Sequence, residues 1–176
     1  MRDYRRIALL VVLLAAAAPR AAQAGEREWV VSPYLGYHVL EARGAARHGG
    51  VAGVDVDYGL TDSWGLRGSA YWNGQWFRRG GDGLLQASGV GLGAQYTFDV
   101  LKVVPYAAAT VGFSAIQGAG IGPRYNAELR IGLGADYLVQ RDFSVGLELR
   151  YALQAPDFNR FPYAISVVLR LSWRRQ

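Results

Sequence analysis

The 176-residue sequence contains no cysteine, and this absence excludes several chemistries. Without cysteine the chain forms no disulfide, holds no cysteine-ligated zinc and carries no lipoprotein acylation site. Histidine is scarce too, with only His38 and His48 present. Carboxylates at metal-ligand spacing are limited to Asp55 and Asp57, which we expect to pair with Arg67. The sequence therefore predicts no metal site and no cofactor.

A basic run is also missing from most of the chain. The formal net charge is +5, but Arg2, Arg5, Arg6 and Arg20 against Asp3 contribute +3 of it, which leaves the rest of the chain near +2. The remaining arginines are dispersed and follow no helical pattern. We therefore expect no nucleic-acid partner, despite the basic composition.

An unbroken apolar run spans Ile7–Ala18, after the basic start MRDYRR and before Ala22-Gln23-Ala24. A run of about 12 residues is shorter than the roughly 18 that a membrane-spanning helix needs. A basic start, a short apolar run and an A-x-A end are typical of a secretory signal. The sequence predicts a signal peptide over 1–24, cleaved after Ala24, and one mature domain over 25–176.

The mature part lacks helical apolar spacing and shows period-two alternation instead, which is typical of strands. Eight strands are predicted, at about 29–40, 51–60, 64–73, 89–98, 104–113, 127–137, 143–151 and 165–173. Short connections, at 61–63, 99–103 and 138–142, alternate with longer ones at 41–50, 74–84, 114–124 and 152–162. Short turns at one rim and longer loops at the other are typical of a transmembrane barrel. The predicted fold is all-β, an eight-stranded antiparallel up-and-down transmembrane β-barrel.

The two faces of these strands differ in chemistry. Aromatic side chains lie on the apolar face near both strand ends, as in the girdles of a membrane barrel. The predicted girdle residues are Tyr37, Trp64, Trp72, Tyr96, Phe98, Phe113, Tyr137, Phe143, Tyr151 and Trp173. A soluble lipocalin-like barrel is the alternative, with the apolar face inside and the charges in water. The aromatic bands favour the membrane barrel.

The opposite face carries charges of both signs among glycines. We predict that they form an interior network of Asp55, Asp57, Arg67, Glu128, Arg130, Glu148, Arg150 and Arg170. Asp55 or Asp57 is expected opposite Arg67, and Glu128 or Arg130 near Glu148 or Arg150, because buried charges need partners. Glycines at alternate inner positions make room for Arg and Tyr from the facing wall. Gly89, Gly91 and Gly93 belong to this pattern, since no helix follows them as in a nucleotide-binding loop.

The chain resembles the small OmpA-like and OmpX-like outer-membrane barrels over about 28–173. The resemblance rests on SPYLGY (Ser32–Tyr37), its echo VPYAAATVGF (Val104–Phe113), YGLTDSWGLRG (Tyr58–Gly68) and AISVVLRLSW (Ala164–Trp173). It implies an outer-membrane location, contact with lipid and lipopolysaccharide, and recognition of the terminal strand by the outer-membrane assembly machinery. That strand usually ends in an aromatic residue, whereas here Arg174, Arg175 and Gln176 follow Trp173.

The leading functional hypothesis is a non-enzymatic integral protein that supports envelope integrity or surface interaction. One alternative is a lipid-modifying enzyme similar to lipid A deacylases, but neither His38 nor His48 has the H-x-S arrangement of that family. A narrow ion-conducting pore is another. The external loops carry basic and aromatic side chains that suit contact with lipopolysaccharide phosphates or with a partner. These are Arg43, Arg47, Trp76, Phe77, Arg78 and Arg79.

Overall fold

The computed structural model describes residues 28–42, 45–76, 84–98, 102–118, 121–155 and 163–175. The predicted signal peptide over 1–24 lies outside this part of the chain. Its cleavage, and with it the domain boundary at residue 25, stays a prediction. No helix in the described ranges is long and apolar enough to cross a membrane.

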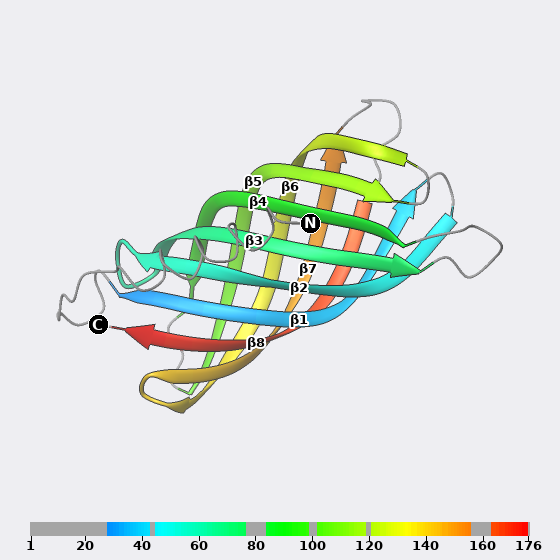
Figure 1. The fold of residues 1–176 in the computed structure, drawn as a ribbon. Helices are drawn as coiled ribbons and strands as arrows, with labels where there is room; N and C mark the ends of the chain where they lie inside the picture. Colours follow the sequence, from blue (N-terminus) through cyan, green and yellow to red (C-terminus); the bar gives the residue numbers. More distant parts are fainter. Residues whose placement is uncertain are drawn as a thin grey trace, which may run out of the picture.

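The described residues form one closed antiparallel barrel in which each strand pairs with its neighbours in the sequence (Figure 1). This confirms the predicted eight-stranded up-and-down fold. The strands are β1 (Trp29–Ala42), β2 (Ala45–Gly59), β3 (Trp64–Trp76), β4 (Leu85–Thr97), β5 (Val103–Gly118), β6 (Ile121–Gln140), β7 (Phe143–Ala155) and β8 (Tyr163–Arg175).

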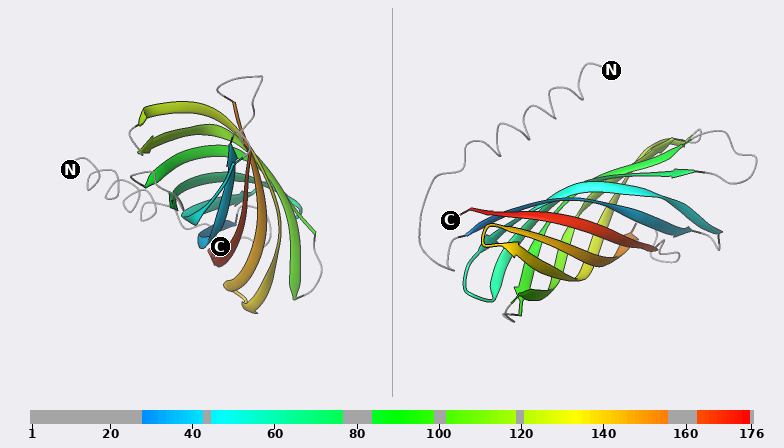
Figure 2. Two further views of the ribbon diagram at one scale, coloured as in Figure 1. Left: turned by 90° about the vertical axis from the view of Figure 1, so that its right-hand side faces the viewer. Right: turned by 90° about the horizontal axis from the view of Figure 1, so that it is seen from below.

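Pairing of the first and last strands closes the barrel. β1 and β8 lie side by side, with Trp29 opposite Arg175 and Glu41 opposite Tyr163 (Figure 2). Arg174 and Arg175 therefore continue the strand. In Figure 1 the strands of the near wall run obliquely across those of the far wall, the tilt that closure of a sheet into a barrel requires.

Side chains alternate between the lumen and the outer surface along each strand, because the pleat has period two. On β7, residues from Ser144 to Gln154 are buried at every second position, while Leu147 and Leu149 are exposed. β5 is the strand whose sequence distinguishes its two faces least. The structure buries Val104, Tyr106, Ala108 and Thr110 there, which agrees with the predicted division.

The prediction of long loops is wrong at two of the four positions, where the structure has strands instead. The expected loop 41–50 belongs largely to strands, since β1 continues to Ala42 and β2 begins at Ala45. Likewise β5 extends to Gly118 and β6 begins at Ile121, within the expected loop 114–124. Ladder hydrogen bonds join backbone groups, so pairing continues through these Gly- and Arg-containing segments where side-chain alternation fades. The middles of the other two expected loops, 77–83 and 156–162, lie outside the described residues.

The lumen changes character along the barrel axis. At the end that carries the turn Thr61–Ser63 lies a cavity of ≈ 340 Å³, which we call the short-turn vestibule. Buried charges fill the middle of the lumen. Toward the opposite end, Leu40, Leu85, Ala152 and Ala164 pack together with Ile116 against them. The interior thus passes from an open polar cavity through a charged layer to an apolar plug.

Glycines at lumen-facing positions allow neighbouring backbone to approach closely. A Cβ at Gly93 would lie 2.6 Å from Cα of Thr110 and 2.7 Å from the carbonyl carbon of Ala109, so the wall itself would have to shift. We predict that Gly93→Val lowers the free energy of unfolding by about 1–3 kcal/mol. Gly122→Val is the matched control, because nothing lies within 4 Å of a Cβ there. Urea unfolding in lipid vesicles measures both, and equal stability would contradict the packing described.

Candidate functional site

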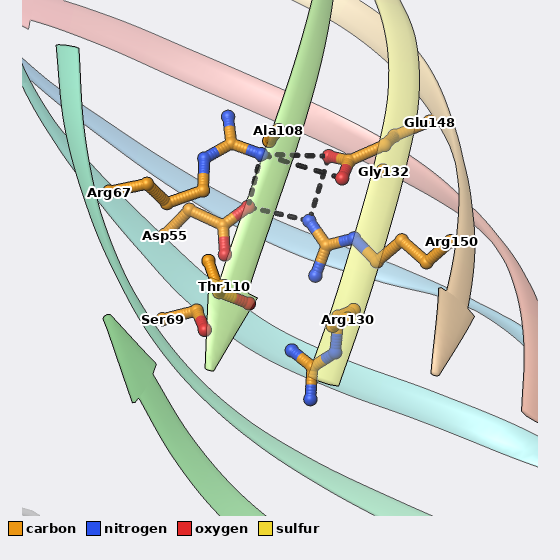
Figure 3. Close-up of a pocket in the computed structure, with 9 residues that line it drawn as sticks. All are labelled: Asp55, Arg67, Ser69, Ala108, Thr110, Arg130, Gly132, Glu148 and Arg150. Atoms are coloured by element: carbon orange, nitrogen blue, oxygen red, sulfur yellow. Dashed lines mark hydrogen bonds and ion pairs between the residues drawn. The ribbon is translucent and has the colours of Figure 1, made fainter. Parts of the chain in front are cut away.

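A ring of alternating charges crosses the middle of the lumen. Arg150 Nη2 donates to Asp55 Oδ2 at 2.5 Å and to Glu148 Oε2 at 2.9 Å. Arg67 Nη1 lies 3.4 Å from Glu148 Oε1 and 3.9 Å from Asp55 Oδ2. Figure 3 shows these four side chains meeting from β2, β3 and β7 (Figure 3). All are at most 4% exposed, so each charge is compensated by protein groups instead of water.

Asp57 and Arg170 extend this ring toward the short-turn end. Arg67 donates two hydrogen bonds to Asp57, from Nε to Oδ1 at 2.7 Å and from Nη2 to Oδ2 at 3.1 Å. Arg170 Nη2 lies 3.3 Å from Asp57 Oδ2, and its Nη1 lies 3.3 Å from Glu148 Oε2. We call these six residues, Asp55, Asp57, Arg67, Glu148, Arg150 and Arg170, the central network. Its carboxylates and guanidinium groups balance in formal charge.

Tyrosine rings support the guanidinium groups. Arg150 Cζ lies 3.8 Å from the ring centroid of Tyr34, and Arg170 Cζ lies 4.7 Å from that of Tyr106. The Tyr106 hydroxyl also donates to Glu148 Oε2 at 2.9 Å. Stacking on an aromatic face is favourable for a desolvated arginine. These tyrosines therefore hold the arginines in place and fill the space beside them.

A smaller polar group lies between the central network and the apolar plug. Glu128 pairs with Arg130, accepts a hydrogen bond from the Tyr71 hydroxyl at 2.5 Å and another from Gln154 Nε2 at 3.2 Å. Arg130 Cζ lies 4.1 Å from the Tyr71 ring centroid. A cavity of ≈ 20 Å³, about one water molecule in size, adjoins this group.

Glycines face the lumen tyrosines. A Cβ at Gly53 would lie 2.6 Å from Cζ of Tyr34, and one at Gly89 would lie 2.7 Å from Cζ of Tyr71. A Cβ at Gly132 would contact the Glu148 carboxylate. We predicted that alternate glycines make room for large side chains from the facing wall. At these positions the room is used instead by side chains of the adjacent strand, since Tyr34 is the ladder partner of Gly53 and Tyr71 that of Gly89.

The structure thus places the sequence-predicted charges in two groups. Asp55, Asp57, Arg67, Glu148, Arg150 and Arg170 meet in the central network, and Glu128 pairs with Arg130 next to it. Asp57 is the cross-strand neighbour of Arg67, as expected. The contacts of Arg150 with Asp55 and of Arg67 with Glu148 cross the lumen, and adjacent-strand spacing gave no signal for them.

The expected girdle residues lie on the outer surface. Trp64 packs against Tyr96, and Tyr96 against Phe98, near the short turns, with ring centroids 5.0 Å and 4.8 Å apart. Phe143 and Trp173 form a similar pair at 5.2 Å. Tyr137 is exposed near the short turns too. Toward the opposite end the exposed girdle residues are Tyr37, Trp72, Phe113 and Tyr151.

Aromatic residues outside the predicted set belong to the same surface. The ring centroids of Trp29 and Tyr58 lie 4.8 Å apart near the short turns, and Tyr163 stacks on Tyr151 toward the opposite end. Alternation alone marked Tyr58 as outward-facing, but its pairing with Trp29 depends on the β1–β2 register.

The two histidines have different surroundings. His38 is 5% exposed inside the lumen, and its Nδ1 lies 2.8 Å from Oγ of Ser166. His48 is exposed and lies 2.5 Å from the Tyr37 hydroxyl through Nδ1. In the described part of the chain, no three His, Asp or Glu side chains are placed to hold a metal ion.

A family model described as the outer membrane protein β-barrel domain matches residues 8–170, most of the chain. This protein belongs to that family. It is accordingly an outer-membrane barrel. Barrels of this kind have their short turns in the periplasm and their longer loops outside the cell. No curated protein sequence matches it significantly.

Solved structures share the barrel fold at low sequence identity. Neisserial surface protein A is 14% identical with a TM-score of 0.67, over 82% of this chain and 96% of that one. Ail of Yersinia pestis is 17% identical with a TM-score of 0.59, over 85% and 99%. The outer membrane enzyme PagL is 18% identical with a TM-score of 0.56, over 82% and 98%. At these identities the likeness concerns the fold alone.

The central network should dominate the stability of this outer-membrane barrel. Glu148→Ala removes the carboxylate that Arg67, Arg150 and Arg170 share, so we predict a loss of about 3–5 kcal/mol in the free energy of unfolding. Glu41→Ala, which removes one partly exposed hydrogen bond from Tyr163 at the external rim, should change the free energy of unfolding far less. Urea titration of both variants in lipid vesicles measures the difference, and a Glu148 variant as stable as the Glu41 variant would refute the role of the network.

Proposed function

We propose that this outer-membrane barrel is a closed, non-catalytic protein that acts through its external end, where it contacts lipopolysaccharide and supports the envelope. The observation that carries the proposal is the filled lumen. The void beside Asp55, Glu148 and Arg150 in the middle of the central network measures only ≈ 10 Å³. The apolar plug of Leu40, Leu85 and Ile116 lies beyond it. Without a path through its interior, the protein presents its lipid-facing surface and its two ends, and the external end is the one exposed to lipopolysaccharide.

Closure of the lumen argues against the pore alternative. An ion entering from the periplasmic side would have to separate arginines and carboxylates that are at most 5% exposed and mutually paired. It would then have to cross apolar side chains, where hydration is lost. Both barriers oppose conduction in the conformation described.

The surroundings of His38 argue against the enzyme alternative. His38 and Ser166 form the kind of contact that a nucleophile and its base make. The pair lies in the lumen, however, where Ser166 is 8% exposed and the adjoining cavity of ≈ 20 Å³ has room for little more than water. An acyl chain of a lipid has no access to it. PagL shows that a barrel of this fold can be an enzyme, but the surroundings of His38 and Ser166 do not favour catalysis by this pair.

The external end offers groups that suit a phosphorylated lipid. Arg124 is exposed at the external end of β6, and Arg47 lies near the start of β2. Arg43, Arg78 and Arg79 lie outside the described residues. Guanidinium groups match the geometry of phosphate and sulfate oxygens. Ail has been solved with the heparin analogue sucrose octasulfate, which is a polyanion, and arginines at this end suit the same class of ligand.

The closed lumen is tested by electrical recording. We predict that the purified protein, inserted into planar lipid bilayers, produces no unit conductance steps, because the central network and the plug block the axis. Glu148→Ala serves as the comparison, since it removes the shared carboxylate of the network. Reproducible steps from the unaltered protein would favour the pore and contradict the proposal.

The external role is tested by lipopolysaccharide binding. We predict that Arg78→Gln with Arg79→Gln weakens binding of lipopolysaccharide to the barrel in nanodiscs by about fivefold, since each exposed ion pair contributes about 0.5 kcal/mol. Arg141→Gln with Arg175→Gln removes the same charge at the periplasmic end and should leave binding unchanged. Equal effects of the two double variants would show that the external arginines form no dedicated contact.

A further inference from the structure

The short-turn vestibule is lined by more acidic than basic side chains. Glu28, Asp62 and Asp136 line it, and Arg174 is the basic residue among its described lining residues. Asp57 also borders it but is already paired with Arg67 and Arg170. Within the described ranges, none of the other three carboxylates forms an ion pair or accepts a hydrogen bond. The cavity therefore has an excess of uncompensated negative charge.

Asp136 is the residue that distinguishes this cavity from an ordinary acidic rim. Its side chain is 7% exposed, and no described group donates a hydrogen bond to it. Arg67, Arg170 and Arg174 are the cations that act on it. None forms an ion pair with it, and the first two bind Asp57 and Glu148 instead. Burial without a hydrogen-bonded partner disfavours the charged carboxylate, so a cation from outside the chain would stabilise that form.

The backbone makes room for this unpaired carboxylate. Gly146 lies directly opposite Asp136 in the β6–β7 ladder, and a Cβ there would collide with Asp136 Oδ1. One carboxylate oxygen thus rests over the glycine and is buried. The residue as a whole borders the vestibule, which leaves the other oxygen as the group that a ligand meets.

The size of the cavity and the polar groups that line it indicate the class of ligand. A volume of ≈ 340 Å³ accommodates a small organic molecule. The described His, Asp and Glu side chains offer no cluster that would ligate a metal ion. An ammonium group instead donates several hydrogen bonds in different directions, which suits the carboxylate of Asp136 in a cavity that the Asp62 carboxylate and the Ser63 hydroxyl group also line.

We propose that the short-turn vestibule binds a small organic ammonium ion from the periplasm, with Asp136 as its charge partner and Glu28 and Asp62 drawing cations to the rim. Binding at this end needs no path through the central network. The proposal is therefore independent of the external role described above, and either one stands if the other fails.

The test uses the refolded full mature chain in detergent micelles, followed by NMR. Ethylammonium chloride is titrated against sodium chloride at constant ionic strength, while the amide signals of Ser63, Thr97 and Asp136 are recorded. We expect saturable shifts with a dissociation constant of about 1 mM, close to the limit for a ligand of three heavy atoms. Sodium acetate should produce no saturable shift, and glycine should bind at least about fivefold more weakly than ethylammonium, because its carboxylate meets the acidic lining.

Asp136→Asn is the decisive variant, since it keeps the shape of the side chain and removes its charge. It should weaken ethylammonium binding at least about tenfold. Asp142→Asn is the matched control, because Asp142 lies in a turn at the same end but does not line the cavity, and it should bind like the unaltered chain. Heat-dependent gel migration verifies that both variants form the barrel.

Three results would overturn the proposal. One is the absence of saturable shifts with ethylammonium in the folded protein. Another is acetate or glycine binding as tightly as ethylammonium, which would assign the cavity to anions or zwitterions through Arg174. A third is equal weakening by Asp136→Asn and Asp142→Asn, which would reduce the effect to the general charge of the periplasmic rim.

Discussion

The barrel depends on mutual compensation of charges that it has removed from water. Asp55, Asp57 and Glu148 are buried with Arg67, Arg150 and Arg170, and each group contacts at least one partner of opposite sign. Balance of the charges within this network makes such an interior tolerable, since an unpaired buried charge is strongly unfavourable. With these charges inside, the outward-facing positions of the strands carry mainly apolar side chains such as Leu133 and Leu147.

Much of this arrangement was predictable because its cause is local. Pleating sends alternate side chains to opposite faces, so the sequence alone assigned Arg67, Glu148 and Arg170 to one face and Leu133 and Leu147 to the other. The turn at Thr61–Ser63 and the even number of strands followed from the same pattern. The cross-strand pair of Asp57 and Arg67 was also accessible, since a short turn fixes the register of its two strands.

Other features depend on closure of the barrel, which no local pattern encodes. Asp55 on β2 meets Arg150 on β7 only because strand tilt brings opposite walls together at that level. The tyrosines under the arginines and the unpaired state of Asp136 are consequences of the same three-dimensional registry.

Strand ends were misjudged for a different reason. Beyond the apolar zone the ladder continues through backbone hydrogen bonds, so Ala45 and Gly118 lie in strands although their neighbours show no alternation.

The central claim is the orientation of the two faces, and nitroxide accessibility tests it most directly. The chain has no cysteine, so Leu133→Cys and Leu147→Cys can each be labelled singly, with Asp62→Cys in a periplasmic turn as the aqueous reference. Both leucines are exposed on the outer face, at 59% and 60%. In bilayers, the labels at these two positions should be relaxed by dissolved oxygen and protected from a water-soluble nickel complex, while the label at position 62 shows the reverse. Labels at 133 and 147 that respond mainly to the nickel complex would contradict an apolar face turned toward lipid.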